Sequence, residues 1–377
     1  MAVSNDLLTD RRVLRHAEAL RGEGCAVALV GRGELGVRHR KGWLFYAEYN
    51  LRLLARLLAV KADVVWANDT DTLPACWLGA RLRGRHLVMD AHELFPEVPE
   101  VTGRRFVKWV WSTFERLLMP RCDALLTVCQ SLADYYRHRY GVEMTVVRNI
   151  SCEKQDEGSG EWIVDSNRNQ MLPTPHSPLS SDKILLYQGC VNEGRGVDWA
   201  IDALEWLPAC RLVVAGGGDL LEEMTRYAAS KPWHDRIVFT GRLRPERLVP
   251  LTRQAAVGLV MLEDKGLSYH YALPNRIGDF VAAGVPMVVS DLPEMAAVVR
   301  RYRVGEVMRE PGAKALAEAV AKVLEQWSPL DEAGRNARFA AAREDMNWQK
   351  ERQKLLAIVP RALSTRESYY CKQKLSI

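Results

Sequence analysis

The sequence predicts an α/β protein with two halves, each built on a parallel β-sheet covered by helices. Short apolar runs of strand length alternate with amphipathic helical segments in both halves of the chain. This alternation is typical of parallel sheets with helices on both faces. Residues 151–182, rich in Ser, Pro, Gly, Asn and charged residues, interrupt the alternation once. A chain of 377 residues also has the length of two domains.

The first half of the chain begins with a short strand at 2–4 and a helix at 11–21, whose end is marked by Gly22 and Gly24. The β-branched run at 26–30 is typical of a buried strand. Further apolar runs predict strands at 63–67, 86–89 and 124–128.

The second half repeats the pattern after the interruption. Its apolar runs predict strands at 184–188, 211–215, 236–240, 257–261 and 286–290, and an amphipathic helix is expected at 348–362. Ligands of parallel sheets bind at the carboxyl ends of the strands. With two such halves, we expect the ligand in a cleft between them.

The same patterns predict the organisation of the chain. Its expected parts are an N-terminal domain at 1–165, a linker at 166–182, a C-terminal domain at 183–345, a C-terminal helix at 346–363 that packs back on the N-terminal domain, and a flexible tail at 364–377.

Composition and charge exclude several classes of protein. Eight scattered cysteines without a CxxC pair or zinc spacing indicate reduced thiols and no metal site. We expect a cytoplasmic protein, because no secretory signal and no apolar run of about 18 residues is visible. The net charge of +5 is modest and no stacking-plus-basic module is present, which argues against nucleic-acid binding.

Residues 32–61 concentrate basic charge beside apolar side chains. Seven Lys and Arg residues stand there against Glu34 and Glu48, and the segment also contains Trp43, Leu44, Phe45 and Tyr46. This pattern favours a peripheral contact with an anionic membrane surface. The alternative is a solvated helix face beside a stripe of core residues.

The segment Gly31–Gly36 reads GRGELG, a literal GxGxxG that follows an expected strand. A dinucleotide-binding fingerprint should open a helix directly and meet an acidic residue at the end of a second strand about 20 residues later. Here VRHRKGW follows, and residues 52–58 have a helical pattern. The sequence therefore favours a glycine-rich turn over a nicotinamide-dependent oxidoreductase.

The strongest candidate for chemistry is the segment YQGCVNEGRG, which follows the expected strand at 184–188. Its glycines Gly189, Gly194 and Gly196 let the backbone approach a ligand closely. Arg195 offers a planar set of donors suited to a diphosphate, and a helix expected at 197–207 would present its N-terminus to anions. The alternative is a simple glycine turn with an exposed arginine.

Three later segments extend this candidate site. The run AGGGD at 215–219 leaves no side chain in the way of a ligand, and FTGRL at 239–243 would turn toward a nucleobase edge. Pro274 suits a first helical turn, so that amides near Asn275 and Arg276 point toward a phosphate. Asp279, one turn further on, would accept both hydroxyls of a ribose; the alternative is an ordinary exposed helix charge.

In the first half, His92 lies in the segment MDAHELF at the end of the expected strand at 86–89. There it would hydrogen-bond a sugar hydroxyl or polarise a leaving phosphate oxygen. The alternative is a structural histidine. The segment NDTD at 68–71 ends the preceding strand and is expected to support the same loop.

These segments carry a family resemblance. In order and spacing, SNDLLTDRRVLRHAEAL, DVVWANDTDTL, DAHELF, YQGCVNEGRG, VVAGGGDL, VFTGRL and ALPNRIGDFVAAGVPMVVSDLPE make the chain similar to the retaining glycosyltransferases of family 4, from about Ser4 to about Leu363. The resemblance implies the GT-B fold, with two Rossmann-like domains facing across a cleft. It implies a nucleotide-diphosphate sugar bound by the C-terminal domain, an acceptor bound by the N-terminal domain, retention of configuration, and no metal or cofactor.

By position, the resemblance assigns roles to single residues. Arg195 matches the residue that holds the diphosphate, Asp279 the ribose-binding acid of a paired-acid motif, and His92 the histidine facing the donor sugar. The chain departs from the pattern at Tyr271, where the first acid would stand, and at Cys190, often basic. His270, Asn275 and Arg276 are candidates to compensate. The expected catalytic residues are His92 and Arg195, and the expected donor-binding residues are Gly189, Asn192, Gly194, Gly196, Gly217, Arg242, Leu243, Tyr271, Pro274, Asn275, Arg276 and Asp279.

The resemblance and the site residues together predict transfer of a sugar to a hydroxyl acceptor. The basic aromatic segment and the family favour a lipid-linked oligosaccharide or polysaccharide precursor as that acceptor. Two alternatives remain at this stage. One is a nucleotide-sugar epimerase or hydrolase on the same fold, and the other is an inactive binding module of a polysaccharide assembly complex, which the replacement of an acid by Tyr271 would suit.

Overall fold

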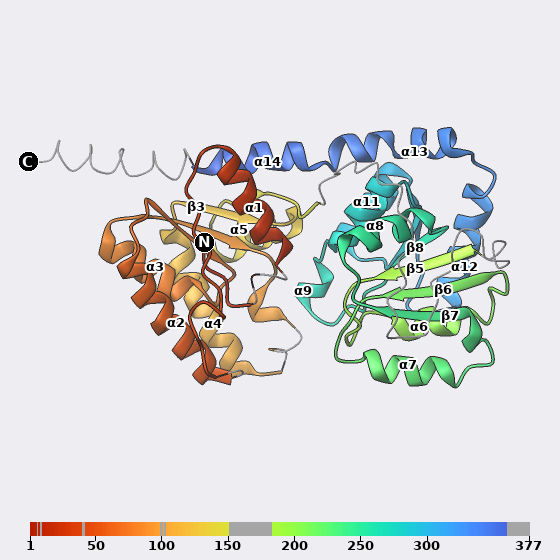
Figure 1. Cartoon of the computed structure of the whole chain (residues 1–377), viewed down its shortest axis with the longest axis horizontal. Coiled ribbons are helices and arrows are strands. Elements are labelled where there is room, and N and C mark those ends of the chain that lie inside the picture. The colour runs from red at the N-terminus through yellow and green to blue at the C-terminus, as the bar shows by residue number, and fades with distance from the viewer. Residues whose placement is uncertain are drawn as a thin grey trace, which may run out of the picture. The chain divides into compact units, whose positions relative to one another are not determined.

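The structure is a computed structural model, and it describes residues 1–5, 7, 10–39, 42–98, 101, 103–150 and 183–359. The expected linker and tail lie outside these residues. The chain divides into two compact units (Figure 1). Unit 1 contains Met1–Asn149, Gly266–Tyr271 and the chain from Gln349 on, and unit 2 contains Ile150–Lys265 and Ala272–Trp348.

Unit 1 contains a four-stranded parallel sheet in the order β1-β2-β3-β4. Its strands are β1 (Val64–Asn68), β2 (His86–Ala91), β3 (Ala124–Thr127) and β4 (Thr145–Val146). Strands β1, β2 and β3 are almost completely buried, as expected for strands covered on both faces. Asn68 pairs with Asp90 at the carboxyl ends of β1 and β2. These two strand ends therefore bring the polar loops that follow them together.

The strand expected at 26–30 forms only in part. Val30 makes a single bridge with Ala2, which also bridges to Ala67 of β1. Val30 is the one buried residue of this run. Because only one position of this run is buried, extending its pairing with a neighbouring strand would stabilise the fold little, and the pairing stays short.

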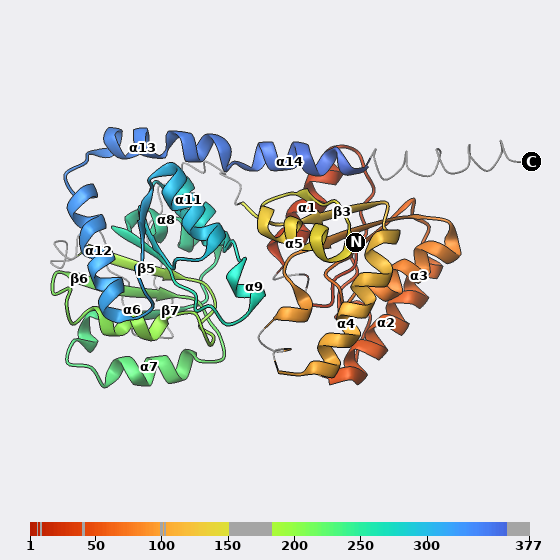
Figure 2. The ribbon, with the colours of Figure 1, turned by 180° about the vertical axis from the view of Figure 1, so that it is seen from behind.

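Helices surround the sheet of unit 1 (Figure 2). Asp10 begins the first of them by accepting a hydrogen bond from the Val13 amide (3.0 Å). Gly84 and Gly141, both left-handed, end two others. The helices are α1 (Arg11–Gly22), α2 (Gly42–Ala59), α3 (Leu73–Arg83), η1 (Phe95–Glu97), α4 (Arg105–Leu118), η2 (Met119–Arg121), α5 (Gln130–Tyr140), α9 (Leu267–His270) and α14 (Trp348–Leu356), whose first residue belongs to unit 2.

Two of these helices come from the far part of the chain. Residues of α9 lie against η1, and the Cys129 thiol donates to the Tyr271 carbonyl (3.3 Å). On α14, the buried Glu351 binds Arg148, with Oε1 2.7 Å from Nη2 and Oε2 2.9 Å from the Arg148 amide. Side chains of the C-terminal segment thus complete unit 1.

Unit 2 contains a six-stranded parallel sheet in the order β10-β9-β8-β5-β6-β7. The strands are β5 (Lys183–Gln188), β6 (Cys210–Ala215), β7 (Ile237–Gly241), β8 (Val257–Val260), β9 (Met287–Val289) and β10 (Gly305–Val307). The helices are α6 (Val197–Ala203), α7 (Leu221–Ala229), η3 (His234–Arg236), α8 (Pro245–Gln254), α10 (Asn275–Ala283), α11 (Pro293–Tyr302), α12 (Ala313–Trp327) and α13 (Glu332–Asp345). Because β5 lies between β8 and β6 in the middle of the sheet, the loop that follows β5 lies between the ends of these two strands.

The segment Gly31–Gly36 is a turn, as predicted. The Leu35 amide donates to the Gly31 carbonyl (3.3 Å), and the next helix, α2, begins only at Gly42. The region at 52–58 lies within this helix. Neither the helix nor the second strand of a dinucleotide-binding fingerprint is therefore present at the required place.

Candidate functional site

In unit 2, the loops after β5 and β6 contact each other through their backbones. The Gly189 amide donates to the Ala215 carbonyl (3.0 Å), and Gly189 has φ 140°. A Cβ atom at Gly216 would lie only 1.7 Å from the Gly189 carbonyl oxygen. Both positions therefore require glycine, one for its conformation and one for space.

Asn192 joins the same two loops. Its Oδ1 accepts a hydrogen bond from the Asp219 amide (3.0 Å), and the Val191 amide donates to Gly217 (3.1 Å). A Cβ atom at Gly218 would lie 2.3 Å from Asn192 Oδ1. The side chain predicted to touch the donor thus also holds the loop.

Substituting Gly216 with Ala is expected to destabilise unit 2 by about 1–3 kcal/mol, because the added methyl group forces the two loops apart. Urea denaturation checks this value. Gly33→Ala is the matched control, since a Cβ atom there meets nothing within 4 Å. Equal stabilities of the two variants would contradict the close loop contact.

The glycines around Arg195 also lie in close contacts. The Glu263 amide donates to the Gly194 carbonyl (2.9 Å), and Gly196 adopts φ 64° directly before α6. A Cβ atom at Gly196 would lie 2.7 Å from Met261 Cβ. Arg195, half-buried, lies between these two glycines. Its backbone is therefore held on both sides. Helix α6 ends at Ala203 instead of continuing to 207 as expected.

Asp279 is held by a network that the sequence did not reveal. Gln188, at the end of β5, donates from Nε2 to Asp279 Oδ2 (2.8 Å). Thr252 of α8 donates to Gln188 Oε1 (2.8 Å). Gln188 and Thr252 are buried, whereas Asp279 is half-exposed. The network fixes the carboxylate beside the loop that follows β5.

Arg276 is buried, and its side chain supports the glycine loop. Nη1 donates to the Gln188 carbonyl (3.1 Å), and the guanidinium lies 4.7 Å from the centre of the Tyr187 ring. The same Nη1 lies 3.3 Å from where a Cβ atom at Gly189 would be. The sequence placed Arg276 at the donor through its amide and did not predict this supporting contact of the side chain.

The remaining expected donor residues occupy different surroundings. Pro274 is the residue before α10, one position earlier than expected, and Asn275 is exposed. Arg242 follows β7 and its side chain lies 3.1 Å from a Cβ position at Gly217. Leu243 beside it is half-buried. Tyr271 belongs to unit 1, so unit 2 does not bring it to the other donor residues.

In unit 1, the buried Asp90 at the end of β2 is the centre of a charged cluster. Arg12 of α1 binds it through two hydrogen bonds, Nε to Oδ2 (2.9 Å) and Nη2 to Oδ1 (2.7 Å). Arg12 also donates to the Val147 carbonyl (2.7 Å). Burial raises the pKa of the Asp90 carboxyl, but the charges of Arg12 and His92 and two imidazole hydrogen bonds hold it well below its usual range. Asp90 is therefore a carboxylate.

His92 lies between two carboxylates of this cluster. Its Nδ1 is 3.3 Å from Asp69 Oδ2, and its Nε2 is 3.4 Å from Asp90 Oδ2. The His92 amide donates to Asp69 Oδ1 (2.8 Å). Burial lowers the pKa of His92, but the two carboxylates outweigh burial and raise it to about 9. The ring is thus cationic near neutral pH.

Asp69 and His16 differ from His92 in their surroundings. Asp69 adopts φ 62°, a strained conformation for a non-glycine residue, in the loop directly after β1. Burial raises its pKa. His16 on α1 is buried 3.2 Å from Asp90 Oδ2, and burial lowers its pKa to about 4. His92, rather than His16, therefore carries the positive imidazole charge. The segment 68–71 was expected to support the loop of His92, but the sequence did not single out Arg12 and His16, which lie one turn apart on the buried face of α1.

The His92 imidazole should stay protonated well above pH 6.5. Its stabilising contribution is fully present below pH 6.5 and is lost as the pH rises toward about 9, because the folded-state pKa is raised. NMR titration of the His92 ring protons measures this pKa, and His92→Gln identifies the signal. A midpoint at or below 6.5 would rule out the ion pairing with Asp69 and Asp90.

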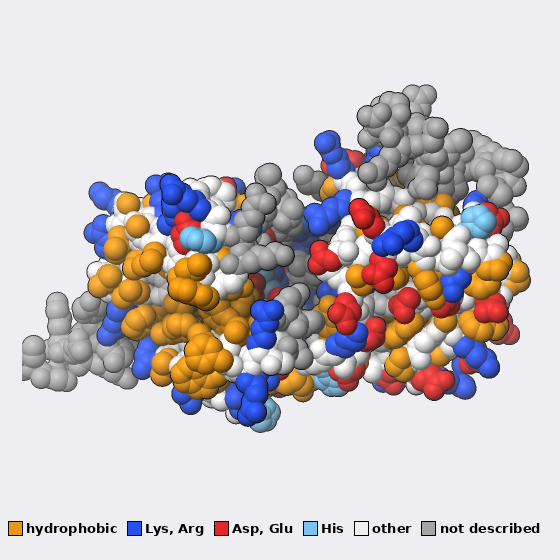
Figure 3. All heavy atoms as spheres, turned by 90° about the horizontal axis from the view of Figure 1, so that it is seen from below, with side chains coloured by type: hydrophobic (Ala, Val, Ile, Leu, Met, Phe, Trp, Pro, Cys, Tyr) orange, Lys and Arg blue, Asp and Glu red, His pale blue; other side chains and the backbone are white. Residues whose placement is uncertain are grey.

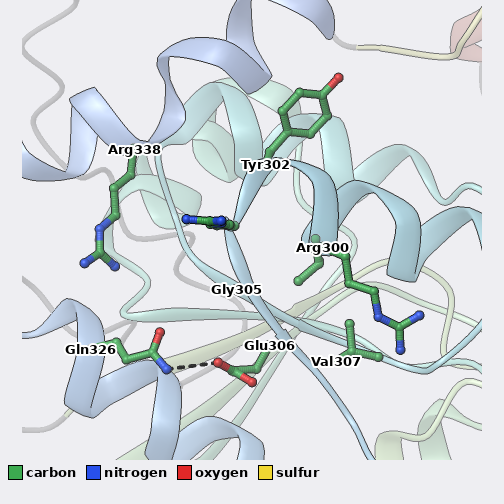
Figure 4. Close-up of a pocket in the computed structure, with 9 residues that line it drawn as sticks. Arg300, Tyr302, Gly305, Glu306, Val307, Gln326 and Arg338 are labelled. Atoms are coloured by element: carbon green, nitrogen blue, oxygen red, sulfur yellow. Dashed lines mark hydrogen bonds between the residues drawn. The ribbon is translucent and has the colours of Figure 1, made fainter.

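A separate cavity of about 790 Å³ lies at the edge strand β10 of unit 2 (Figure 4). Residues of α11, α12 and α13 surround it, and Gln326 donates to Glu306 there (3.0 Å). None of the expected donor residues lines it. This cavity is therefore distinct from the glycine loops.

Comparisons with known proteins agree with the two-unit architecture. Residues 9–150 match the family model described as Glycosyltransferase Family 4, and residues 182–326 match the model described as Glycosyl transferases group 1. The glycogen synthase of Mycobacterium tuberculosis is 26% identical over 247 residues, which cover 62% of this chain and 53% of the synthase. The chain thus spans about half the length of the curated relatives it matches.

Solved structures show a likeness in fold. A glycosyltransferase from Rickettsia africae ESF-5 matches with TM-score 0.69 and 13% identity over 96% of this chain and 97% of that one. Anabaena Alr3699/HepE in complex with UDP and glucose matches with TM-score 0.68 and 12% identity over 95% and 98%. Sucrose-phosphate synthase from Thermosynechococcus elongatus gives 0.63 and 17% over 97% and 93%.

Two parallel α/β units with these neighbours define the class of protein as one with the GT-B fold. Two glycosyltransferase family models match the chain, one over 9–150 and the other over 182–326.

Proposed function

We propose that the protein transfers a sugar from a nucleotide-diphosphate sugar to a hydroxyl group of an acceptor, with retention of configuration. The observation that carries this proposal is the arrangement at the carboxyl end of β5 in unit 2. There, backbone-packed glycine loops adjoin a carboxylate, Asp279, that Gln188 holds in place. Glycine loops at the carboxyl end of a parallel strand, beside an oriented carboxylate, suit a diphosphate and the ribose attached to it.

The donor would bind through three kinds of group. Asp279 would accept the ribose hydroxyls, with its orientation set by Gln188. The first amides of α10 would donate to a phosphate, as the N-terminus of a helix favours anions. Arg195 would bind the diphosphate. The complexes of Anabaena Alr3699/HepE with UDP and with UDP-glucose support a nucleotide sugar as the ligand class.

In the reaction we propose, the bond between the anomeric carbon and the phosphate oxygen breaks, and a bond from the acceptor oxygen to that carbon forms on the same face. The departing phosphate oxygen takes the proton of the acceptor hydroxyl. Arg195 would stabilise the negative charge that grows on the diphosphate. His92 is cationic, with a pKa of about 9. It would therefore donate a hydrogen bond to a hydroxyl of the donor sugar or to the leaving phosphate oxygen, and it would not act as a base. No nucleophile from the protein is needed for this step.

The acceptor we propose is a lipid-linked oligosaccharide or polysaccharide precursor, bound by residues of unit 1. The family resemblance and the basic, aromatic character of α2 support this class of acceptor. We propose that transfer takes place at the cytoplasmic side of a membrane.

An assay with and without acceptor tests the proposal. The protein is incubated with a panel of nucleotide-diphosphate sugars, alone and with lipid-linked oligosaccharides, and both donor consumption and sugar transfer are followed. We expect transfer to the acceptor with the anomeric configuration of the donor kept, as NMR of the product shows. Donor consumption that needs no acceptor would indicate an epimerase or hydrolase instead. Nucleotide binding without turnover on any acceptor would indicate a binding module.

A further inference from the structure

Helix α4 of unit 1 exposes a stripe of apolar side chains. Phe106 is 74% exposed and Trp109 is 61% exposed, and their rings stack with centroids 5.9 Å apart. Leu117, two turns further along the same helix, is 46% exposed. Their spacing places all three on one face of the helix. Among the described residues, this face is left open to solvent.

Helices α2 and α3 continue the apolar surface. On α2, Trp43, Leu44 and Leu51 are exposed, and Ala47 and Ala55 complete an exposed apolar stripe. On α3, the exposed apolar residues are Leu78 and Leu82, one turn apart. Helix α2 packs against α3 and α3 against α4, and the three helices lie side by side in both views of the ribbon (Figures 1 and 2).

Most of the large exposed hydrophobic residues that the structure describes lie on these three helices, and only Trp206 and Val249 lie in unit 2. Figure 3 shows hydrophobic side chains gathered over unit 1 with Lys and Arg around them. A concentration of this kind marks an interaction surface rather than ordinary scatter.

The exposed charged side chains on the three helices all carry a positive charge. Within their bounds no exposed side chain is acidic, because Glu115 is buried and Glu48 is half-buried and bound to Arg52. The exposed basic residues are Arg56, Arg81, Arg83, Arg105, Lys108 and Arg116. Aromatic and aliphatic side chains surrounded by Lys and Arg complement the headgroups and acyl boundary of an anionic bilayer. A protein partner of mixed charge fits this surface less well.

The sequence located this surface only in part. It singled out residues 32–61, but Phe45 is buried and Tyr46 packs against Trp111, with ring centroids 5.0 Å apart. Trp43 and Leu44 are exposed as a membrane contact requires. Helix α4, with the most exposed aromatic pair, lies outside the expected segment.

We propose that α2, α3 and α4 form a docking face for an anionic lipid bilayer. Phe106, Trp109 and Trp43 enter the boundary between headgroups and acyl chains, and the surrounding Lys and Arg residues bind the headgroups. Within the described part of the chain, no helix is both long and apolar enough to span a bilayer. The proposal is independent of the sugar-transfer chemistry.

Co-sedimentation with vesicles tests the docking face. Wild-type protein should sediment with vesicles of phosphatidylcholine mixed with phosphatidylglycerol, and much less with phosphatidylcholine alone. The double variant Phe106→Ser/Trp109→Ser should bind the anionic vesicles at least about tenfold more weakly. The variant Arg105→Ser/Arg116→Ser should lose about fivefold per charge, the equivalent of about 1 kcal/mol for each basic residue near the surface. High salt should weaken wild-type binding in the same direction.

Matched controls separate docking from general effects. Trp206→Ser removes an exposed tryptophan of unit 2, and Arg226→Ser removes an exposed arginine there; both should bind like wild type. Thermal unfolding of each variant checks that it is folded. Wild-type binding that ignores anionic lipid, or a Phe106/Trp109 variant that binds as wild type does, overturns the proposal. Loss of a dimer in light scattering for that variant, without vesicle binding by the wild type, would assign the face to a second copy of the chain.

Discussion

Replacing Arg195 with Ala is expected to lower kcat by about 10²–10³-fold while leaving the unfolding temperature nearly unchanged. The reason is that the proposed role of Arg195 lies in the transition state, where negative charge grows on the leaving diphosphate. Removing one donor from such an electrostatic site costs a rate factor of this order. Because the backbone on both sides of Arg195 is held by glycine contacts, the loop should keep its shape without the side chain. Steady-state kinetics and a thermal melt give both quantities.

Two control variants make this result specific. Arg226→Ala removes an exposed arginine from α7 of the same unit and should change neither kcat nor KM. Arg195→Lys keeps one positive charge and should recover part of the rate. Wild-type turnover in Arg195→Ala would show that the diphosphate binds elsewhere. A large fall in the unfolding temperature would instead show that the arginine supports the fold.

Replacing Asp90 with Ala is expected to lower the free energy of unfolding of unit 1 by about 3–5 kcal/mol. Asp90 is fully buried and binds Arg12, which is itself buried, through two hydrogen bonds. Removing one partner of a buried ion pair leaves the other charge without compensation in a medium of low dielectric. The loss also removes the carboxylate that faces His92 Nε2. Urea denaturation followed by far-ultraviolet circular dichroism measures the change.

The surface pair Asp134–Arg137 provides the control for this prediction. Both side chains are well exposed, so Asp134→Ala should cost less than about 1 kcal/mol. Arg12→Met combined with Asp90→Leu should be more stable than Asp90→Ala, because no buried charge is left alone. A cost for Asp90→Ala as small as that of Asp134→Ala would mean that the cluster around His92 is hydrated and mobile.

Much of the fold follows from the sequence, because long buried strands leave a clear apolar pattern. Strands β5 and β6 have six residues each, and both were expected nearly to the residue. Strands β4 and β10 have two and three residues with half-buried side chains, too short and too mixed for such a pattern. The run at 26–30 had the right composition but is fully buried only at Val30. Composition alone does not show which apolar run becomes buried in the folded protein.

The candidate site was predictable where its chemistry is local. The glycines at 189 and 216–218 are visible in the sequence because the loops need them for conformation and space. The partners that orient the functional groups are distant along the chain. Gln188 reaches Asp279, 91 residues away, and Arg12 reaches Asp90, 78 residues away. A pattern over a few neighbouring residues cannot predict pairs that are this far apart in the sequence. The strained backbone of Asp69 likewise follows from the loop around it.

Titration calorimetry with UDP, GDP, ADP and dTDP tests the central claim most directly, namely that the glycine loops and Asp279 of unit 2 bind a nucleoside diphosphate. We predict that at least one of these nucleotides binds the wild-type protein at one site per chain. Asp279→Asn and Gly216→Ala should each weaken that binding at least about tenfold, and His92→Gln, a variant of unit 1, should bind the nucleotide as the wild type does. Absence of binding by all four nucleotides, or binding that both unit 2 variants leave unchanged, would contradict the account.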